Sequence, residues 1–150
     1  MTAHTQPDTT HVVTCFLLRQ SHNGAEVLLV RRSQQVRTYK GAWAGVSGYL
    51  EPGVTPVEQA YTEMNEETRL QRSDVLLVRE GEPLTFHDTK LGLTWVIHPF
   101  LFRLAENATI RTDWEATEYE WVSPALISQR ETVPMLAEAL AHVYPQASAE

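Results

Sequence analysis

The sequence predicts an α/β fold, in which a mixed β-sheet is packed between helices, and three observations lead to it. Apolar runs typical of strands outnumber helical patterns along the chain. One helical pattern begins directly after a Gly/Pro-rich loop at residues 48–53, and a second, at 133–144, closes the chain. Because strands and helices with one apolar side must bury those sides against each other, these elements favour a layered domain.

The first strands are predicted from apolar runs at residues 12–18 and 26–32, which the turn-forming segment 21–24 separates. Two such runs around a short turn indicate an antiparallel hairpin. Residues 43–50 predict a third strand that is rich in small residues. Small residues in a strand often mark a place where a ligand or another backbone approaches closely.

Four further runs predict the rest of the sheet, at 75–79, 84–87, 93–104 and 118–122. The longest of them contains Pro99. Since proline has no N–H to donate to a neighbouring strand, Pro99 predicts either a β-bulge or an edge position.

The helix that follows the loop is predicted from its N-terminal residues. Thr55 suits the N-cap, Pro56 suits the first helical position, and Glu58 completes a capping box three residues after the threonine. Apolar residues recur at helical spacing along this segment, at Val57, Ala60, Tyr61 and Met64. That side of the helix is therefore expected to face the sheet.

Length, charge and cysteine usage bound the class of protein. The 150 residues fit one domain, which we place at 11–145, after a polar lead-in at 1–10 that we expect to be disordered. The single Cys15 excludes an internal disulfide, and the sequence has neither a membrane-spanning run nor a signal-peptide pattern, so we expect a cytoplasmic protein without a membrane partner. A net charge of −7 without a basic stripe argues against a nucleic-acid polymer as partner.

Three carboxylates, those of Glu63, Glu66 and Glu67, share one face of the predicted helix because they are spaced i, i+3 and i+4. Like charges this close repel one another, so solvent, basic side chains or a bound hard cation must offset them. Carboxylate oxygens are ligands for Mg²⁺ or Mn²⁺, and such a site suits the cleavage of a pyrophosphate bond. The alternative is a solvated helix face, although a plain surface helix does not need such an entry loop.

The loop and helix together resemble the signature of a known family. The residues that stand at the spacing of that signature are Gly48, Glu63, Met64, Glu66, Glu67 and Leu70. The chain thus resembles the Nudix hydrolases, which are MutT-like pyrophosphohydrolases. The resemblance implies a Nudix-like α/β/α sandwich that hydrolyses a pyrophosphate bond in a nucleoside diphosphate linked to another moiety. It also implies a small nucleotide-type substrate and leaves a homodimer open.

The resemblance further implies catalytic roles for particular residues. Glu63, Glu66 and Glu67 would hold Mg²⁺ or Mn²⁺, and the Gly48 carbonyl would join them. Glu63 is the default general base, and a carboxylate on a later loop is the alternative. The later candidates are Asp113, Glu115 and Glu118. Among these Glu115 is preferred, although a solvated acidic turn explains each of them equally well.

Three positions depart from the signature: Val54 replaces its first glutamate, Thr62 its arginine and Arg69 its glycine. The missing glutamate and arginine normally orient the metal ligands, and the loss of such support commonly weakens affinity or activity 10–100-fold. The competing interpretation is therefore a catalytically weak or inactive nucleotide-sensing or interaction module with the same fold.

Substrate contacts are predicted from basic and aromatic residues outside the helix. Arg32 and Lys40 are candidates to hold phosphates, and Trp43 or Trp95 to stack on a base. Core packing is the alternative explanation for Trp95, and a solvated loop for Lys40.

Overall fold

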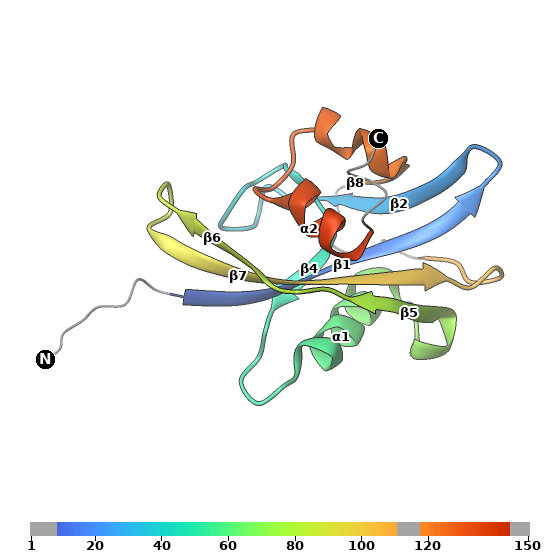
Figure 1. Cartoon of the computed structure of the whole chain (residues 1–150), viewed down its shortest axis with the longest axis horizontal. Helices are drawn as coiled ribbons and strands as arrows, with labels where there is room; N and C mark the ends of the chain where they lie inside the picture. The colour runs from blue at the N-terminus through green and yellow to red at the C-terminus, as the bar shows by residue number, and fades with distance from the viewer. Residues whose placement is uncertain (1–8, 111–117, 145–150) are drawn as a thin grey trace, which may run out of the picture.

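The computed structural model describes residues 9–110 and 118–144, which form one mixed sheet with helices on both faces. The elements are β1 (Thr9–Ser21), β2 (Gly24–Arg31), β3 (Trp43–Ala44), β4 (Val46–Tyr49), α1 (Pro56–Thr68), η1 (Arg72–Asp74), β5 (Val75–Glu80), β6 (Leu84–Asp88), β7 (Leu93–Leu104), β8 (Glu118–Val122), η2 (Pro124–Gln129) and α2 (Leu136–Val143). Helix α1 covers one face of the sheet, and α2 with η2 covers the other (Figure 1). The predicted α/β/α sandwich is confirmed.

Strand β1 organises the sheet, since it pairs with β2, β4 and β7. It runs parallel to β7, from Thr9 opposite Thr94 to Leu18 opposite Arg103, and antiparallel to the other two strands. β4 pairs with the first half of β1 and β2 with its last residues, so the strands that follow β1 separate from each other along its length. This separation places the cavity described below.

The core lies on both faces of the sheet because successive residues of β1 point to opposite sides. Phe16 and Leu18 pack in the cluster that includes Leu140 of α2, whereas Cys15 and Leu17 pack in the cluster on the α1 side. A strand covered on both faces requires the nearly continuous apolar run that the sequence shows here.

Helix α1 begins as predicted, with Thr55 at the N-cap and proline at the start of the helix. The Thr55 hydroxyl accepts a hydrogen bond from the Glu58 backbone N–H at 3.3 Å. The Glu58 carboxylate pairs with Arg72 at 2.6 Å rather than returning to the cap. The helix ends at Arg69, whose left-handed backbone (φ 67°) lets its N–H bond the carbonyl of Asn65.

Pro99 lies inside the sheet, so the predicted edge position is wrong. Its strand, β7, lies between β1 on one side and β5 with β6 on the other, and Pro99 stays in register with Thr14. The Pro99 carbonyl accepts a hydrogen bond from Gly81 at 2.9 Å, where the chain leaves β5 and has not yet entered β6. The proline nitrogen faces the same break, where no ladder donor is required. The register shift of this region occurs in β5, between Leu77 and Arg79.

Some predicted boundaries move. β1 begins at Thr9, so Thr9 and Thr10 belong to the sheet rather than to the lead-in, and residues 1–8 lie outside the described part. The predicted third strand divides at Gly45 into β3 and β4. A Cβ on Gly45 would lie 2.8 Å from the Cys15 carbonyl oxygen, so only glycine allows this approach to β1.

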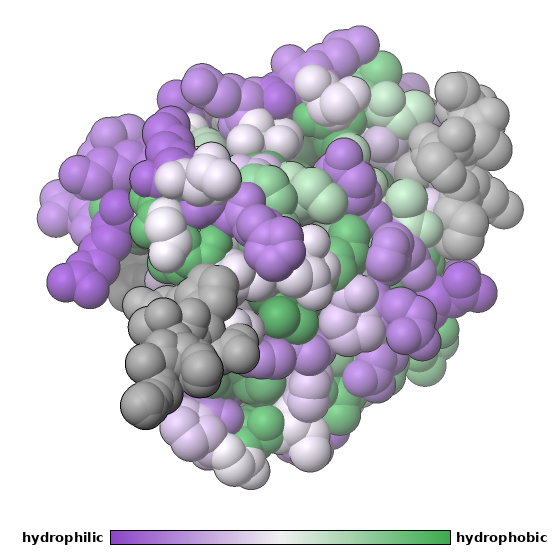
Figure 2. Space-filling model, turned by 60° about the vertical axis from the view of Figure 1, so that its left-hand side comes forward, coloured by the Kyte–Doolittle hydropathy of each residue, from purple (hydrophilic) through white to green (hydrophobic). Residues whose placement is uncertain are grey.

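The surface shows no segregation of hydrophobic residues on the face seen in Figure 2, where hydrophobic and hydrophilic residues are interspersed. The large hydrophobic side chains that are exposed come from several elements and are Tyr49, Leu76, Val78, Leu91, Tyr119 and Leu126. Within residues 9–110 and 118–144, no helix is long and apolar enough to cross a membrane.

Candidate active site

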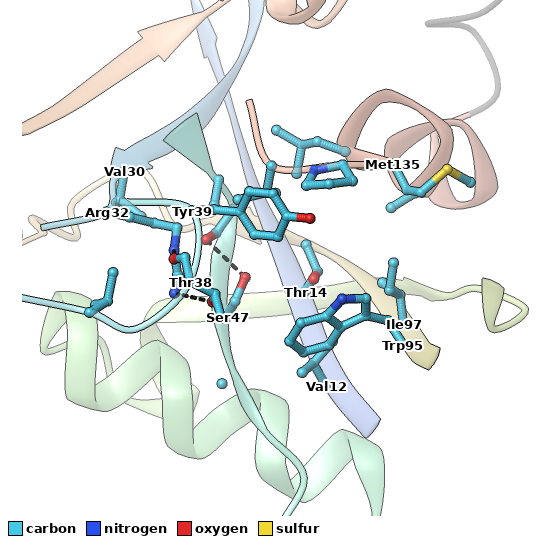
Figure 3. Close-up of a pocket in the computed structure, with 18 of the residues that line it drawn as sticks. Val12, Thr14, Val30, Arg32, Thr38, Tyr39, Ser47, Trp95, Ile97 and Met135 are labelled. Atoms are coloured by element: carbon cyan, nitrogen blue, oxygen red, sulfur yellow. Dashed lines mark hydrogen bonds between the residues drawn. The ribbon is translucent and has the colours of Figure 1, made fainter. Parts of the chain in front are cut away.

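A cavity of about 700 Å³ is lined by five of the residues that the sequence singles out, namely Arg32, Gly48, Glu63, Glu67 and Trp95. Its lining comes from α1 on one face of the sheet and α2 on the other, and from β1 and β4 between them. Figure 3 shows Arg32, Thr38 and Ser47 on one side of this cavity and Trp95 and Met135 on the other. The cavity thus has a carboxylate end near α1 and an aromatic end near β6 and β7.

The carboxylate end is built by α1 and β4. Glu63 and Glu67 are one helical turn apart and both line the cavity, together with Gly48 of β4. A Cβ on Gly48 would overlap the Glu63 carboxyl group, so the absence of a side chain lets that carboxyl lie against the β4 backbone. The predicted grouping of Glu63, Glu67 and Gly48 is therefore found in the structure.

The charges at this end are not balanced within the chain. Burial, followed by the nearby Glu63 charge, raises the pKa of Glu67 to about 9, against the opposing effects of the Ser47 backbone and Arg32. Burial also raises the pKa of Glu63, and Glu66 adds to this, while hydrogen bonds from Gln59 and Glu67 oppose it. These shifts favour a proton shared by the two interacting acids, and added positive charge would favour the ionisation of both.

Glu66 is placed differently from its two neighbours. Its side chain is exposed and does not line the cavity, and it acts on Glu63 only through its charge. Among the residues that the structure describes, no three His, Cys, Asp or Glu side chains are already gathered as a metal site. The oxygen donors of Glu63, Glu67 and Gly48 nevertheless fit a hard divalent cation, whose charge would offset the paired acids.

Gln59 lies behind this end of the cavity and contacts Glu63, although the sequence did not single it out. It is 2% exposed, and its Nε2 donates to Glu63 Oε2 at 2.9 Å. Its Oε1 accepts a hydrogen bond from the Glu51 backbone at 3.0 Å. The sequence signal was the i, i+4 spacing of Gln59 and Glu63, which becomes informative only once the glutamine is known to be buried.

The two arginines at the end of β2, Arg31 and Arg32, form part of the lining. Arg32 donates to the Thr38 carbonyl at 2.9 Å and to its hydroxyl at 3.2 Å, which holds the loop at 33–42 beside the cavity. Arg31 also lines the cavity, and it pairs with Glu118 at 2.6 Å. Glu118 is thus a partner of an arginine, whereas Asp113 and Glu115 lie outside the described residues.

Lys40 and Trp43, two predicted substrate contacts, do not line the cavity. Lys40 is exposed on the loop. Trp43 packs against the apolar cluster under α2, and its backbone bonds Glu131 and Val133. The indole is used for packing because β3 places it on the side of the sheet that α2 covers.

The aromatic end is tied together by one acid. Asp88 is 3% exposed and accepts hydrogen bonds from the Tyr39 hydroxyl at 2.5 Å, the Trp95 indole at 3.0 Å and the Leu91 backbone at 3.1 Å. Burial alone would raise the pKa of Asp88, but these hydrogen bonds outweigh it and lower the pKa. Burial and the bond to Asp88 raise the pKa of Tyr39 to about 12, so its hydroxyl remains a donor.

The aromatic end joins parts of the chain that are distant in sequence, since Tyr39 and Asp88 are 49 positions apart. Tyr39 adopts a left-handed backbone conformation (φ 52°) in its loop, which is unusual for a bulky residue. Trp95 was a stacking candidate from the sequence, and the structure places it in the lining with Tyr49 stacked on it at 6.4 Å.

The fold agrees with the comparisons with known proteins. The chain belongs to the NUDIX domain family, whose model matches residues 9–146. Among solved structures, the MutT protein from Methanosarcina mazei Go1 is 23% identical and has a TM-score of 0.75, covering 95% of this chain and 98% of that one. A Caenorhabditis elegans Ap4A hydrolase in a binary complex is 14% identical, with a TM-score of 0.74 and coverage of 94% and 99%.

A third similar structure is the NUDIX domain of NrtR from Shewanella oneidensis, complexed with ADP ribose. It is 13% identical, with a TM-score of 0.70, and the match covers 95% of this chain and 90% of that one. At these identities the structural likeness establishes a common fold.

Proposed function

We propose that this protein is a divalent-metal-dependent hydrolase that cleaves a pyrophosphate bond in a nucleoside diphosphate linked to another moiety. The observation that carries the proposal is the convergence of Glu63, Glu67 and Gly48 at one end of a cavity. Two half-buried acids with raised pKa values and no full counter-charge are a destabilising arrangement that a bound cation would relieve. Membership of the NUDIX domain family supports the same reaction class.

In this proposal, different residues bind the cation and accept the proton of the attacking water. Glu63, Glu67 and the Gly48 carbonyl would hold Mg²⁺ or Mn²⁺, with Glu66 as a further oxygen donor from the solvent side. When bound, the cation neutralises phosphate oxygens and increases the acidity of a water molecule. We assign the acceptance of the water proton to the Glu63 carboxylate, which Gln59 orients, and keep Glu115 as the second candidate.

The lining of the cavity suits a substrate with a phosphate part and a planar or apolar part. A volume of about 700 Å³ lies within the usual range for small-molecule sites. Arg31 and Arg32 supply positive charge near the carboxylate end, while Trp95 and Tyr49 supply ring faces at the other end. We therefore propose that phosphates lie near α1 and that the linked group or the base lies beside Trp95.

The buried, free Cys15 suits the reducing environment of the cytoplasm, where we place the protein.

A nucleotide-sensing or interaction module is the second candidate, because two departures from the family signature remove charged support. Val54 has no polar side-chain atom, and Thr62 is exposed on α1. The pocket and fold would persist in such a protein while turnover is lost.

A substrate panel separates the two candidates. The full chain is incubated with nucleotide sugars, dinucleoside polyphosphates, ADP-ribose and nucleoside triphosphates in Mg²⁺ or Mn²⁺, and products are separated by chromatography. Cleavage of one class at the pyrophosphate bond, lost with a chelator and reduced at least ~100-fold in Glu63→Gln, is the expected result. Binding of a nucleotide without product from any class would favour the sensing module and contradict the hydrolase.

A further inference from the structure

We infer that Gln59 is a positioning residue that holds the Glu63 carboxylate in place for the cation and fixes the loop before α1 with the same amide group. The inference rests on the proposed function, since it concerns how the proposed cation site is built. It adds a residue that the family signature does not specify.

The burial of Gln59 is the first step of the argument. A glutamine side chain that is 2% exposed loses its hydrogen bonds to water and must regain them within the protein. Gln59 lies on the face of α1 that packs near β4, one turn before Glu63. A residue used only for packing at this position would be apolar, as Ala60 and Met64 are.

The two hydrogen bonds of Gln59 fix the orientation of its amide. The Glu51 N–H can only donate, so it selects the amide oxygen at 3.0 Å. The amide nitrogen is then directed at Glu63 Oε2, which it reaches at 2.9 Å. Reversing the amide would oppose donor to donor and acceptor to acceptor, so one rotamer state is favoured.

The Glu63 carboxyl is consequently confined from two sides. Gln59 contacts it along the helix, and the backbone of Gly48 lies against it from β4. Confinement of this kind reduces the rotamer freedom that a free glutamate would lose on binding a cation. The two substituted signature positions near Glu63 do not confine its carboxyl group, because Val54 is apolar and Thr62 is exposed.

The second bond links the carboxylate to the loop. Glu51 begins the turn Glu51–Val54, in which the Val54 N–H bonds the Glu51 carbonyl at 3.2 Å. Because the same amide holds both the turn and Glu63, the loop that precedes α1 and the proposed cation ligand are positioned together. We therefore expect changes at Gln59 to affect the loop and the cation site in parallel.

The test uses Gln59→Met, which keeps the length of the side chain and removes both hydrogen bonds. Binding of Mn²⁺ to the full chain without substrate is measured by calorimetry, and hydrogen exchange of the Glu51 amide is followed in the same protein. We expect ~10–100-fold weaker Mn²⁺ binding and faster exchange at Glu51. Gln59→Asn, which keeps an amide that is too short to span both partners, is the second variant in case the first does not fold.

Thr94→Val is the matched control, because Thr94 is also buried and its hydroxyl is also hydrogen-bonded, to His87 at 3.1 Å. It should lower the melting temperature without changing Mn²⁺ affinity. If wild-type protein binds Mn²⁺ and the Gln59 variants bind it equally well, the inference is wrong while the proposed function stands. If wild-type protein does not bind Mn²⁺ at all, the cation site itself is refuted and the inference with it.

Discussion

Glu67 lines one end of the cavity and Asp88 holds Tyr39 and Trp95 at the other end, and the chain treats these two acids in opposite ways. Asp88 receives hydrogen bonds from Tyr39, Trp95 and Leu91, and its pKa is lowered despite its burial. Glu67 lies beside Glu63, and its pKa is raised to about 9. The difference lies in the partners, since three donors face Asp88 whereas a second acid, Glu63, faces Glu67.

The comparison distinguishes a structural acid from one that is available to a ligand. Where the chain itself supplies enough hydrogen-bond donors, the acid is ionised and stabilises the fold, as Asp88 stabilises the aromatic end of the cavity. Where the chain brings acids together and leaves them short of positive charge, an external cation has the most to contribute. The following predictions test this distinction, beginning with the largest effect.

Replacing Asp88 by asparagine should destabilise the aromatic end strongly. The amide keeps one acceptor but adds a donor group opposite the Tyr39 hydroxyl and the Trp95 indole, so a charge-assisted network is lost. We expect a decrease of about 3 kcal/mol in the free energy of unfolding, measured by urea denaturation. Tyr39→Phe, which removes a single donor, should decrease it by only about 1 kcal/mol. Equal effects of the two substitutions would show that Asp88 is not the centre of the network.

Replacing Gly48 by alanine should damage function more than stability. The added Cβ overlaps the Glu63 carboxyl, which is the end of a flexible side chain and can move away. We expect turnover and Mn²⁺ affinity to fall ~10–100-fold, with a melting temperature close to that of the wild type. Gly92→Ala is a poor control because its φ is +71°, whereas Ser47→Ala keeps the β4 backbone and tests the general tolerance of this strand. Full activity of Gly48→Ala would place the cation elsewhere.

The stability of the metal-free protein should depend on pH with opposite signs at the two ends. The pKa of Glu67 is raised in the folded state, so the folded protein binds more protons than the unfolded chain between pH 4.5 and about 9. Stability therefore falls as pH rises through this window, by up to roughly 1 kcal/mol per pH unit. The pKa of Asp88 is lowered, so its contribution is present above 3.8 and is lost as pH falls through the lowered value.

Urea denaturation of the metal-free protein, from acidic pH to about pH 9, measures the pH dependence of stability that each acid causes. Glu67→Gln should flatten the decline at high pH, and added Mn²⁺ should counter it in the wild type only. A decline that persists in Glu67→Gln would assign the slope to other groups.

The smallest expected effect is at Arg69, where the family signature has glycine. Arg69 is the C-cap of α1 with φ +67°, a conformation that glycine adopts without strain. Arg69→Gly should therefore stabilise the protein by about 0.5–1 kcal/mol, with no change in Mn²⁺ affinity. A loss of affinity would show that this position supports the cation site after all.

The sequence by itself determined the elements and their order. The apolar runs predicted β1, β2, β7 and β8, and the Thr55–Pro56 signal predicted the start of α1, because these patterns depend on near neighbours along the chain. The spacing of Glu63 and Glu67 predicted that they share a face of the helix, since helical geometry alone sets that relation.

Only the tertiary structure decided which residues meet. Pro99 is tolerated inside the sheet because β5 gives way to β6 beside it, and no local pattern contains that information. The separation of β2 from β4 opens the cavity, and it leaves Lys40 and Trp43 outside. The roles of Asp88 and Gln59 depend on partners that packing places beside them. A buried polar side chain must orient toward such partners, and burial is a property of the whole fold.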